Sequence, residues 1–104
     1  MLCMAVEIVR FVDESFPGFV ECHLKDASGQ QHVFVDKVPI VTAADLGPDS
    51  VYPQRGAIAC ELSDQWADDQ GRELRRINTA KPWAIESISG AHSFVVLAEQ
   101  LSED

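Results

Sequence analysis

The sequence predicts an all-β fold, a single small barrel or sandwich of about six mostly antiparallel strands. Apolar and polar side chains alternate along most segments, which is the period of a half-buried strand. Turn-forming residues separate consecutive segments, so neighbouring strands are expected to form hairpins in a meander. A chain of 104 residues, 46% of them apolar and 24% charged, has the size and composition of one domain. We therefore expect one domain over residues 1–104.

Three strands are expected in the first part of the chain, at residues 4–12, 19–25 and 31–38. The first is followed by a polar turn, Asp13–Gly18, and the third ends before a proline, which cannot donate to a strand ladder. The turn between the second and third is Asp26–Gly29, where aspartate bonds its own backbone and glycine accepts a positive φ.

The register of this hairpin can be predicted in two ways. The hydrophobic pattern places Leu24 opposite Val33 and Cys22 opposite Val35, so that small apolar side chains share one face. It also places His32 opposite a lysine. The Asp-x-x-Gly turn, which often includes a glycine bulge, favours a register shifted by one residue. We expect the register of the hydrophobic pattern.

Residues 42–56 form the longest irregular stretch, with at most one short helical turn near 43–47, capped by Thr42. A second hairpin is expected between residues 57–66 and 72–79, around the turn Asp68–Gly71.

A three-residue loop in this second hairpin pairs Trp66 with Leu74 and Asp64 with Arg76. The last strand is expected at residues 93–98. The acidic tail at about 99–104 is expected to fray.

The charge of the chain limits the partners that it can attract. Seventeen acidic residues against eight basic ones leave a formal net charge of −9. Such a surface repels phosphate backbones and anionic lipids, whereas it attracts a basic protein. We therefore expect a protein partner, with nucleic acid disfavoured and no membrane partner.

The cysteines and the first residues predict a cytoplasmic location. Cys3, Cys22 and Cys60 are odd in number and far apart, unlike the even disulfide framework of a small secreted domain. The first residues lack the features of a signal peptide, and Met4 is an alternative start to Met1. No apolar run has the length of a transmembrane helix.

No motif predicts catalysis, a metal or a cofactor. His23, His32 and His92 lack metal-ligand spacing with one another and with the cysteines, and no nucleophile elbow or glycine-rich phosphate loop is present. An enzyme is therefore the least favoured of three functional classes, and no cofactor is expected.

Two groups of residues are candidates for binding. Basic side chains cluster at residues 72–81 beside a tryptophan, as in single-strand nucleic-acid or acidic-peptide sites. Tyr52 and Arg55 flank a proline at the end of the irregular stretch, where they could face a partner. The alternatives are that Arg76 pairs with Asp64 and that Tyr52 plugs one end of the barrel. The complete candidate set is Arg72, Arg75, Arg76, Lys81, Trp83, Tyr52 and Arg55.

Two segments resemble the Sm-like RNA-binding barrels. Val20–Gly29 is similar to the strand-and-turn opening of that family, and Gln54–Ile58 is similar to its later Arg-Gly strand. The resemblance implies a small barrel. The family's Asp-x-x-Met-Asn segment has no counterpart in residues 34–42, so the resemblance does not extend to the family's RNA site.

The leading functional hypothesis is a small acidic binding protein without catalytic activity, such as an inhibitor or immunity-type protein for a basic partner. The alternative is an Sm-like or OB-like nucleic-acid binder that uses the arginine and tryptophan patch. Monomer and homo-oligomer are equally expected, since the apolar strand Phe94–Ala98 could offer an edge to a second copy.

Overall fold

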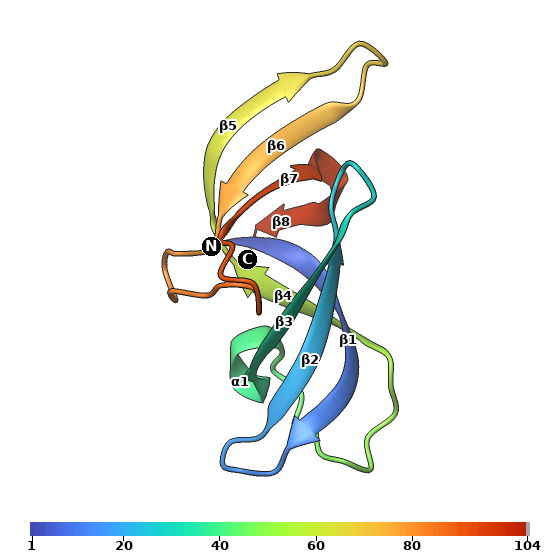
Figure 1. Ribbon diagram of the computed structural model, residues 1–104, viewed down its shortest axis with the longest axis vertical. Helices are drawn as coiled ribbons and strands as arrows, with labels where there is room; N and C mark the ends of the chain where they lie inside the picture. Colours follow the sequence, from blue (N-terminus) through green and yellow to red (C-terminus); the bar gives the residue numbers. More distant parts are fainter. Residues whose placement is uncertain (104) are drawn as a thin grey trace.

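The computed structural model describes residues 1–103 and is all-β, as the sequence predicts (Figure 1). The larger sheet contains β1 (Leu2–Asp13), β2 (Phe19–Lys25), β3 (Gln31–Lys37), β4 (Gln54–Ala59) and β8 (Leu101–Glu103). The smaller sheet contains β5 (Glu61–Ala67), β6 (Glu73–Asn78) and β7 (Ser93–Leu97). In the described range, no helix is long and apolar enough to cross a membrane.

Strand β1 organises the larger sheet, in which the strand order is β3-β2-β1-β4. It has 12 residues, which is enough to pair with three other strands. Its first half pairs with β4, from Cys3 opposite Ala59 to Ile8 opposite Gln54. Its second half pairs with β2, and its first residues also pair with β8. The sheet therefore joins the beginning, middle and end of the described chain.

The chain passes from one sheet to the other at Cys60. The predicted strand 57–66 is divided here into the end of β4 and most of β5, because the Cys60 amide still bonds the Leu2 carbonyl at 3.0 Å before the chain turns away. The hairpin of β5 and β6 then projects from the body of the molecule (Figure 1). This division and strand β8 raise the number of strands from the predicted six to eight.

Both sheets contribute to one hydrophobic core. Phe34 of β3 and Phe94 of β7 meet edge to face at 5.5 Å between ring centroids, and each is almost fully buried. Burying side chains of this kind contributes roughly 1.5–3 kcal/mol each. Fully buried neighbours are Met4, Ile8, Val20, Cys22, Ile58, Ile77 and Val96.

The register expected for the first hairpin is wrong by one residue. In the structure His23 lies opposite Val33, Leu24 opposite His32, and Lys25 opposite Gln31. The reason is the turn, in which the Gly29 amide bonds the Asp26 carbonyl at 3.0 Å and Gly29 has a φ of +87°. Phe34, which lies opposite Cys22, supplies the buried side chain, and the two valines point outward.

The second hairpin has the predicted register, with Trp66 opposite Leu74 and Asp64 opposite Arg76. Its turn repeats the hydrogen bonds of the first, with the Gly71 amide donating to the Asp68 carbonyl at 3.0 Å.

Two local predictions are corrected by the structure. The short helix α1 is Val38–Val41, before the expected 43–47, and Thr42 ends it rather than beginning one. A proline in the first turn suits this helix, since its missing amide hydrogen is not needed there. The tail expected to fray forms a 3-10 turn, η1 (Ala98–Gln100), and then β8; Asp104 lies outside the described residues.

Candidate functional site

The predicted arginine patch is neutralised by carboxylates of its own hairpin. Arg72 bonds Asp68 at 2.7 Å and donates to the Ala27 carbonyl at 3.0 Å. Arg75 reaches Glu73 at 3.4 Å. These contacts direct the guanidinium groups to partners within the chain.

Arg76 is also engaged within the hairpin. Its guanidinium lies 5.2 Å from the centroid of the Trp66 ring and 3.7 Å from Asp64. The pairing with Asp64 that the sequence offered as an alternative is therefore present.

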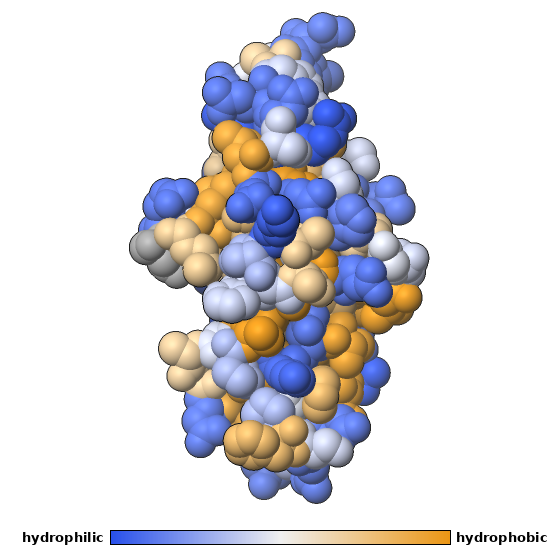
Figure 2. All heavy atoms as spheres, turned by 90° about the vertical axis from the view of Figure 1, so that its left-hand side faces the viewer, coloured by the Kyte–Doolittle hydropathy of each residue, from blue (hydrophilic) through white to orange (hydrophobic). Residues whose placement is uncertain are grey.

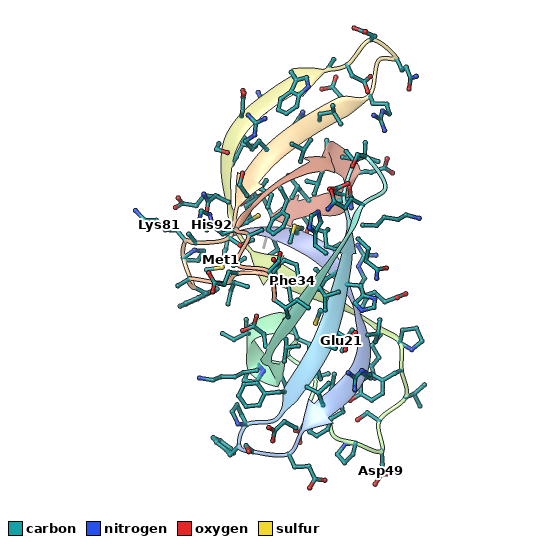
Figure 3. The ribbon with its side chains drawn as sticks, viewed as in Figure 1. Met1, Glu21, Phe34, Asp49, Lys81 and His92 are labelled. Carbon is teal, nitrogen blue, oxygen red and sulfur yellow. The ribbon has the colours of Figure 1, made fainter. Side chains whose placement is uncertain are left out.

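Lys81 and Trp83 lie apart from Arg72. They belong to the segment between β6 and β7, at the end of β6 opposite to Arg72 (Figure 3). Six residues of strand separate the two ends by roughly 20 Å. Trp83 is 51% exposed. The predicted patch is thus divided between two regions of the molecule.

The other two predicted residues, Tyr52 and Arg55, lie in different environments. Tyr52 packs against the core and donates a hydrogen bond from its hydroxyl to the Gly47 carbonyl at 2.8 Å. Arg55 points to solvent on β4, where it lines a groove of about 830 Å³ on the outer face of the larger sheet. No local sequence pattern indicates that other polar residues join Arg55 there.

The groove crosses β4, β1 and β2, and residues of η1 also line it. Its floor includes Ala5 and Glu7 of β1, and its walls include Arg55 on one side and His23 and Lys25 on the other. In residues 1–103, neither Arg55 nor Lys25 forms an ion pair, unlike Arg10, Arg72, Arg75 and Arg76.

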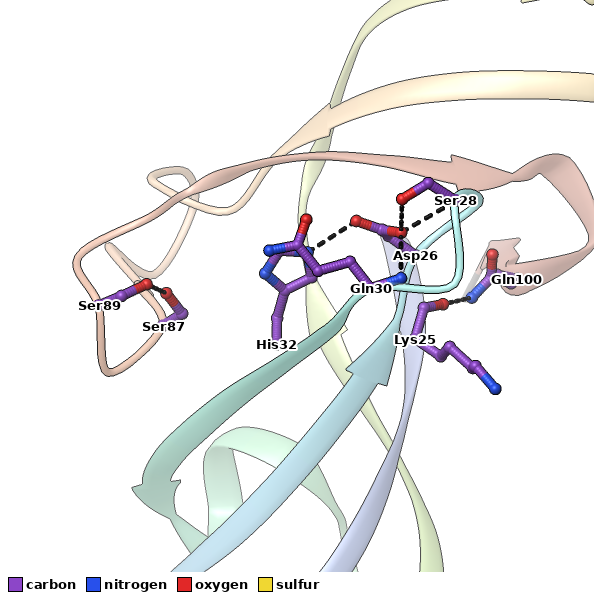
Figure 4. Close-up of polar contacts among 8 residues, drawn as sticks. All are labelled: Lys25, Asp26, Ser28, Gln30, His32, Ser87, Ser89 and Gln100. Atoms are coloured by element: carbon purple, nitrogen blue, oxygen red, sulfur yellow. Dashed lines mark hydrogen bonds and ion pairs between the residues drawn. The ribbon is translucent and has the colours of Figure 1, made fainter.

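Hydrogen bonds hold the β2 wall of the groove in place. Glu21 accepts from Arg10 at 2.9 Å and contacts His23 at 2.7 Å, so the imidazole is oriented from outside the groove. The hydrogen bond with His23 is the main reason that the pKa of Glu21 is lowered, although burial opposes this. Gln100 of η1 donates to the Lys25 carbonyl at 2.9 Å and so holds η1 against the end of β2 (Figure 4).

A cluster around Asp26 joins the two sheets (Figure 4). Asp26 accepts from the Ser28 amide at 2.9 Å, the Gln30 amide at 3.0 Å and His32 at 2.8 Å. His32 also packs edge to face on Phe94 at 4.9 Å. His32 therefore faces Asp26 and the core rather than the lysine expected from the sequence.

A second exposed surface, which we name the acidic pole, lies at one end of the long axis. It is formed by the β1–β2 turn and the loop 42–53, which both lie at the lower end of Figure 1, and Figure 3 labels Asp49 there. Four carboxylates on these segments form no ion pair within the described part of the chain: Asp13, Glu14, Asp45 and Asp49. Lys37, across from Phe19, brings one positive charge to this end.

The acidic pole also exposes apolar side chains. Phe16 is 96% exposed and Val51 is 79% exposed, the two highest values among the large hydrophobic residues of the described chain. Figure 2 shows apolar atoms among hydrophilic ones at this lower end. Sequence reasoning missed Phe16, although an aromatic residue within a polar Pro-Gly turn is a usable signal of exposure.

Histidine, cysteine and acidic side chains are spread over the described residues. Among them, no three histidine, cysteine or acidic side chains are grouped to hold a metal ion. Burial is the main cause that raises the pKa of Cys22 to about 12 and that of Cys60 to about 11. Both thiols are therefore protonated and poor nucleophiles near neutral pH.

The edge expected to serve self-association is partly occupied. The Val95 carbonyl of β7 accepts a hydrogen bond from the Ala27 amide at 2.9 Å, so the β2–β3 turn lies against this strand.

Comparisons with known proteins add no relative: no family model, no curated protein and no solved structure matches this chain.

Proposed function

We propose that the protein is a non-enzymatic binding protein that engages a basic protein partner through the acidic pole, in the manner of an inhibitor or immunity-type protein. The single observation that carries this proposal is the exposure of Phe16 and Val51 on a surface whose four carboxylates form no ion pair within the described residues. Exposed large apolar side chains with a charged surround match the anchor-and-rim composition of protein interfaces.

The charge of the pole defines the chemistry of the partner. The acidic pole includes four carboxylates and one ammonium group, and the whole chain has a formal charge of −9. Attraction over roughly 8 Å at physiological salt accelerates the encounter with a basic surface and repels an acidic one. The partner is therefore a basic protein with an apolar pocket or groove for an aromatic side chain.

The arginine contacts favour this proposal over nucleic-acid binding. Arg72, Arg75 and Arg76 each contact a carboxylate of their own hairpin, so binding a phosphate there requires breaking an existing ion pair. Phosphate contacts supply most of the affinity of non-specific nucleic-acid binding.

Affinity capture from the source cells with variants of the pole tests the proposal. The wild-type protein is expected to retain a basic protein at low salt and to release most of it at high salt. Phe16→Ala, at a 96% exposed position, is expected to weaken retention at least tenfold without changing the fold.

The matched control is Ile88→Ala, which removes an apolar side chain that is 69% exposed and lies on the segment between β6 and β7. It is expected to retain the same partner as the wild type. Equal loss with Ile88→Ala, or equal retention with Phe16→Ala, contradicts a role for the pole.

A further inference from the structure

The groove on the larger sheet is distinct from the acidic pole, and charged side chains of both signs line it. They are Arg55 of β4, Glu7 of β1, Lys25 of β2 and Glu99 of η1. Two positive and two negative groups make the groove formally neutral, in a chain with a net charge of −9.

One pair of opposite charges, Arg55 and Glu7, lies on adjacent strands. The two residues are direct partners in the β1–β4 ladder, and both point to the outer face. Their Cβ atoms are therefore about 5 Å apart. In the described chain the two side chains nevertheless form no ion pair with each other or with another residue. A guanidinium and a carboxylate thus stand side by side, each open to a ligand.

Small side chains leave room beside this pair. Ala5 is two residues from Glu7 on the same face of β1, and its partner on β4 is Ala57. Of these two alanines, Ala5 lines the groove, and its methyl group leaves a hollow that longer side chains surround. Because strands form the floor and His23 is held by Glu21, the hollow exists without a rearrangement.

The balance of charge favours a ligand that has both signs. A net anion is repelled by the protein as a whole, and a net cation is attracted to carboxylates over the entire surface. A zwitterion experiences neither effect, yet it can pair an acid group with Arg55 and an amino group with Glu7. Guanidinium–carboxylate pairs of this kind are frequently bidentate.

We propose that the groove binds a small zwitterion of the α-amino-acid class, with its carboxylate on Arg55 and its ammonium group on Glu7. The apolar part of the ligand lies over Ala5 and toward Pro53 and Leu97, which also line the groove.

Chemical-shift titration of the ¹⁵N-labelled protein with three related probes tests this proposal. L-leucine has both charges, N-acetyl-L-leucine only the carboxylate, and L-leucinamide only the ammonium group. L-leucine is expected to shift the amides of Ala5, Glu7 and Arg55 in a saturable manner. Each of the other probes is expected to bind at least tenfold more weakly.

Charge variants with a matched control locate the site. Arg55→Gln and Glu7→Gln are each expected to weaken L-leucine binding about tenfold, and both positions are exposed enough for the fold to persist. Lys81→Gln removes one positive charge outside the groove and is expected to leave binding unchanged. Amide spectra of the variants confirm that each is folded.

Three results would overturn the proposal. Equal binding of N-acetyl-L-leucine assigns the groove to anions, and equal binding of L-leucinamide assigns it to cations. No saturable shift with L-leucine up to about 50 mM removes the site altogether. None of these outcomes depends on the acidic pole, so the two proposals succeed or fail separately.

Discussion

Replacing Asp26 with alanine is expected to lower the free energy of unfolding far more than is usual for a residue in a hairpin turn. The carboxylate accepts hydrogen bonds from two backbone amides and from His32, and the Asp26 and His32 side chains are only 12% and 16% exposed. A hydrogen bond to a charged group contributes about 1.5–3 kcal/mol. In the variant the two turn amides can bond water instead, so the loss of their hydrogen bonds to Asp26 lowers the free energy of unfolding by a smaller amount.

We therefore expect the free energy of unfolding to fall by about 3 kcal/mol in Asp26→Ala. At an m-value of about 1.5 kcal/mol/M, this shifts the midpoint of urea unfolding by about 2 M. The measurement is equilibrium denaturation in urea at pH 7, followed by tryptophan fluorescence.

The second hairpin supplies the control. Asp68 makes the same two bonds to turn amides, to Gln70 and Arg72 at 2.9 Å each. Its side-chain partner is Arg72 at 2.7 Å, which is 44% exposed, so water screens this ion pair more than the bond between Asp26 and the 16% exposed His32. Asp68→Ala is expected to lower the free energy of unfolding by clearly less than Asp26→Ala does. Equal losses in the two variants, or a loss below about 1 kcal/mol for Asp26→Ala, would refute a role for the His32 bond.

The pH dependence gives an independent check on the same residue. Burial opposes the ionisation of Asp26, but hydrogen bonds from His32, Ser28 and Gln30 together lower its pKa below the usual 3.8. The contribution of the charged form is thus present above that value and is lost as the pH falls below it. The stability difference between wild type and Asp26→Ala is expected to shrink below pH 3.8. A difference that stays constant through this range contradicts the assignment.

Three further predictions concern packing, backbone and thiols. Gly56→Ala is expected to lower the free energy of unfolding in urea by about 1–3 kcal/mol, because the new Cβ lies 2.8 Å from a buried isoleucine side chain. The control is Gly47→Ala, in which the new Cβ meets nothing within 4 Å and the free energy of unfolding is expected to change little. Ala84 has a φ of 56°, so Ala84→Gly is expected to raise the midpoint of thermal unfolding by a few degrees, and a lower midpoint would contradict the strain. Cys22 and Cys60 are expected to resist a disulfide reagent at pH 8 until the protein unfolds, and rapid labelling of the folded protein would show that they are accessible.

The strands could be predicted where alternation is regular. Residues 19–25 form β2 with the predicted limits, and the register of the second hairpin is confirmed by Trp66 opposite Leu74. The first hairpin was predicted one residue out of register, because the prediction placed Val33 and Val35, rather than Phe34, on the buried face. Phe34 alone fills the core there, and the glycine turn enforces the shift.

Long-range pairing could not be predicted from local patterns. The division of the predicted strand at Cys60 depends on a bond to Leu2, and the pairing of the acidic tail depends on the free edge of β1. Both contacts join residues far apart in sequence. The alternation of apolar and polar side chains identifies a strand but does not identify the strand with which it pairs.

The candidate surfaces show the same limit. Clustering in sequence suggested the arginine patch, but cross-strand neighbours neutralise it, as Asp64 does for Arg76. Arg55 was identified from the sequence as a candidate, whereas its partner Glu7 lies 48 positions away and required the β1–β4 register. The acidic pole required the knowledge that two turns lie at one end of the molecule.

The three-way pairing of β1 has a consequence for the order in which the molecule assembles during synthesis. Strands β1, β2 and β3 can form hairpins as soon as they leave the ribosome, because their partners are adjacent in sequence. The edge of β1 that pairs with β4 stays open until residues 54–59 have been synthesised. The first residues of β1 gain their pairing with β8 only when residues 101–103 have been synthesised. Until residues 101–103 are synthesised, part of the apolar edge of β1 is therefore unpaired, which is the kind of surface that chaperones bind. A ribosome stalled before residue 101 would hold this edge incompletely paired.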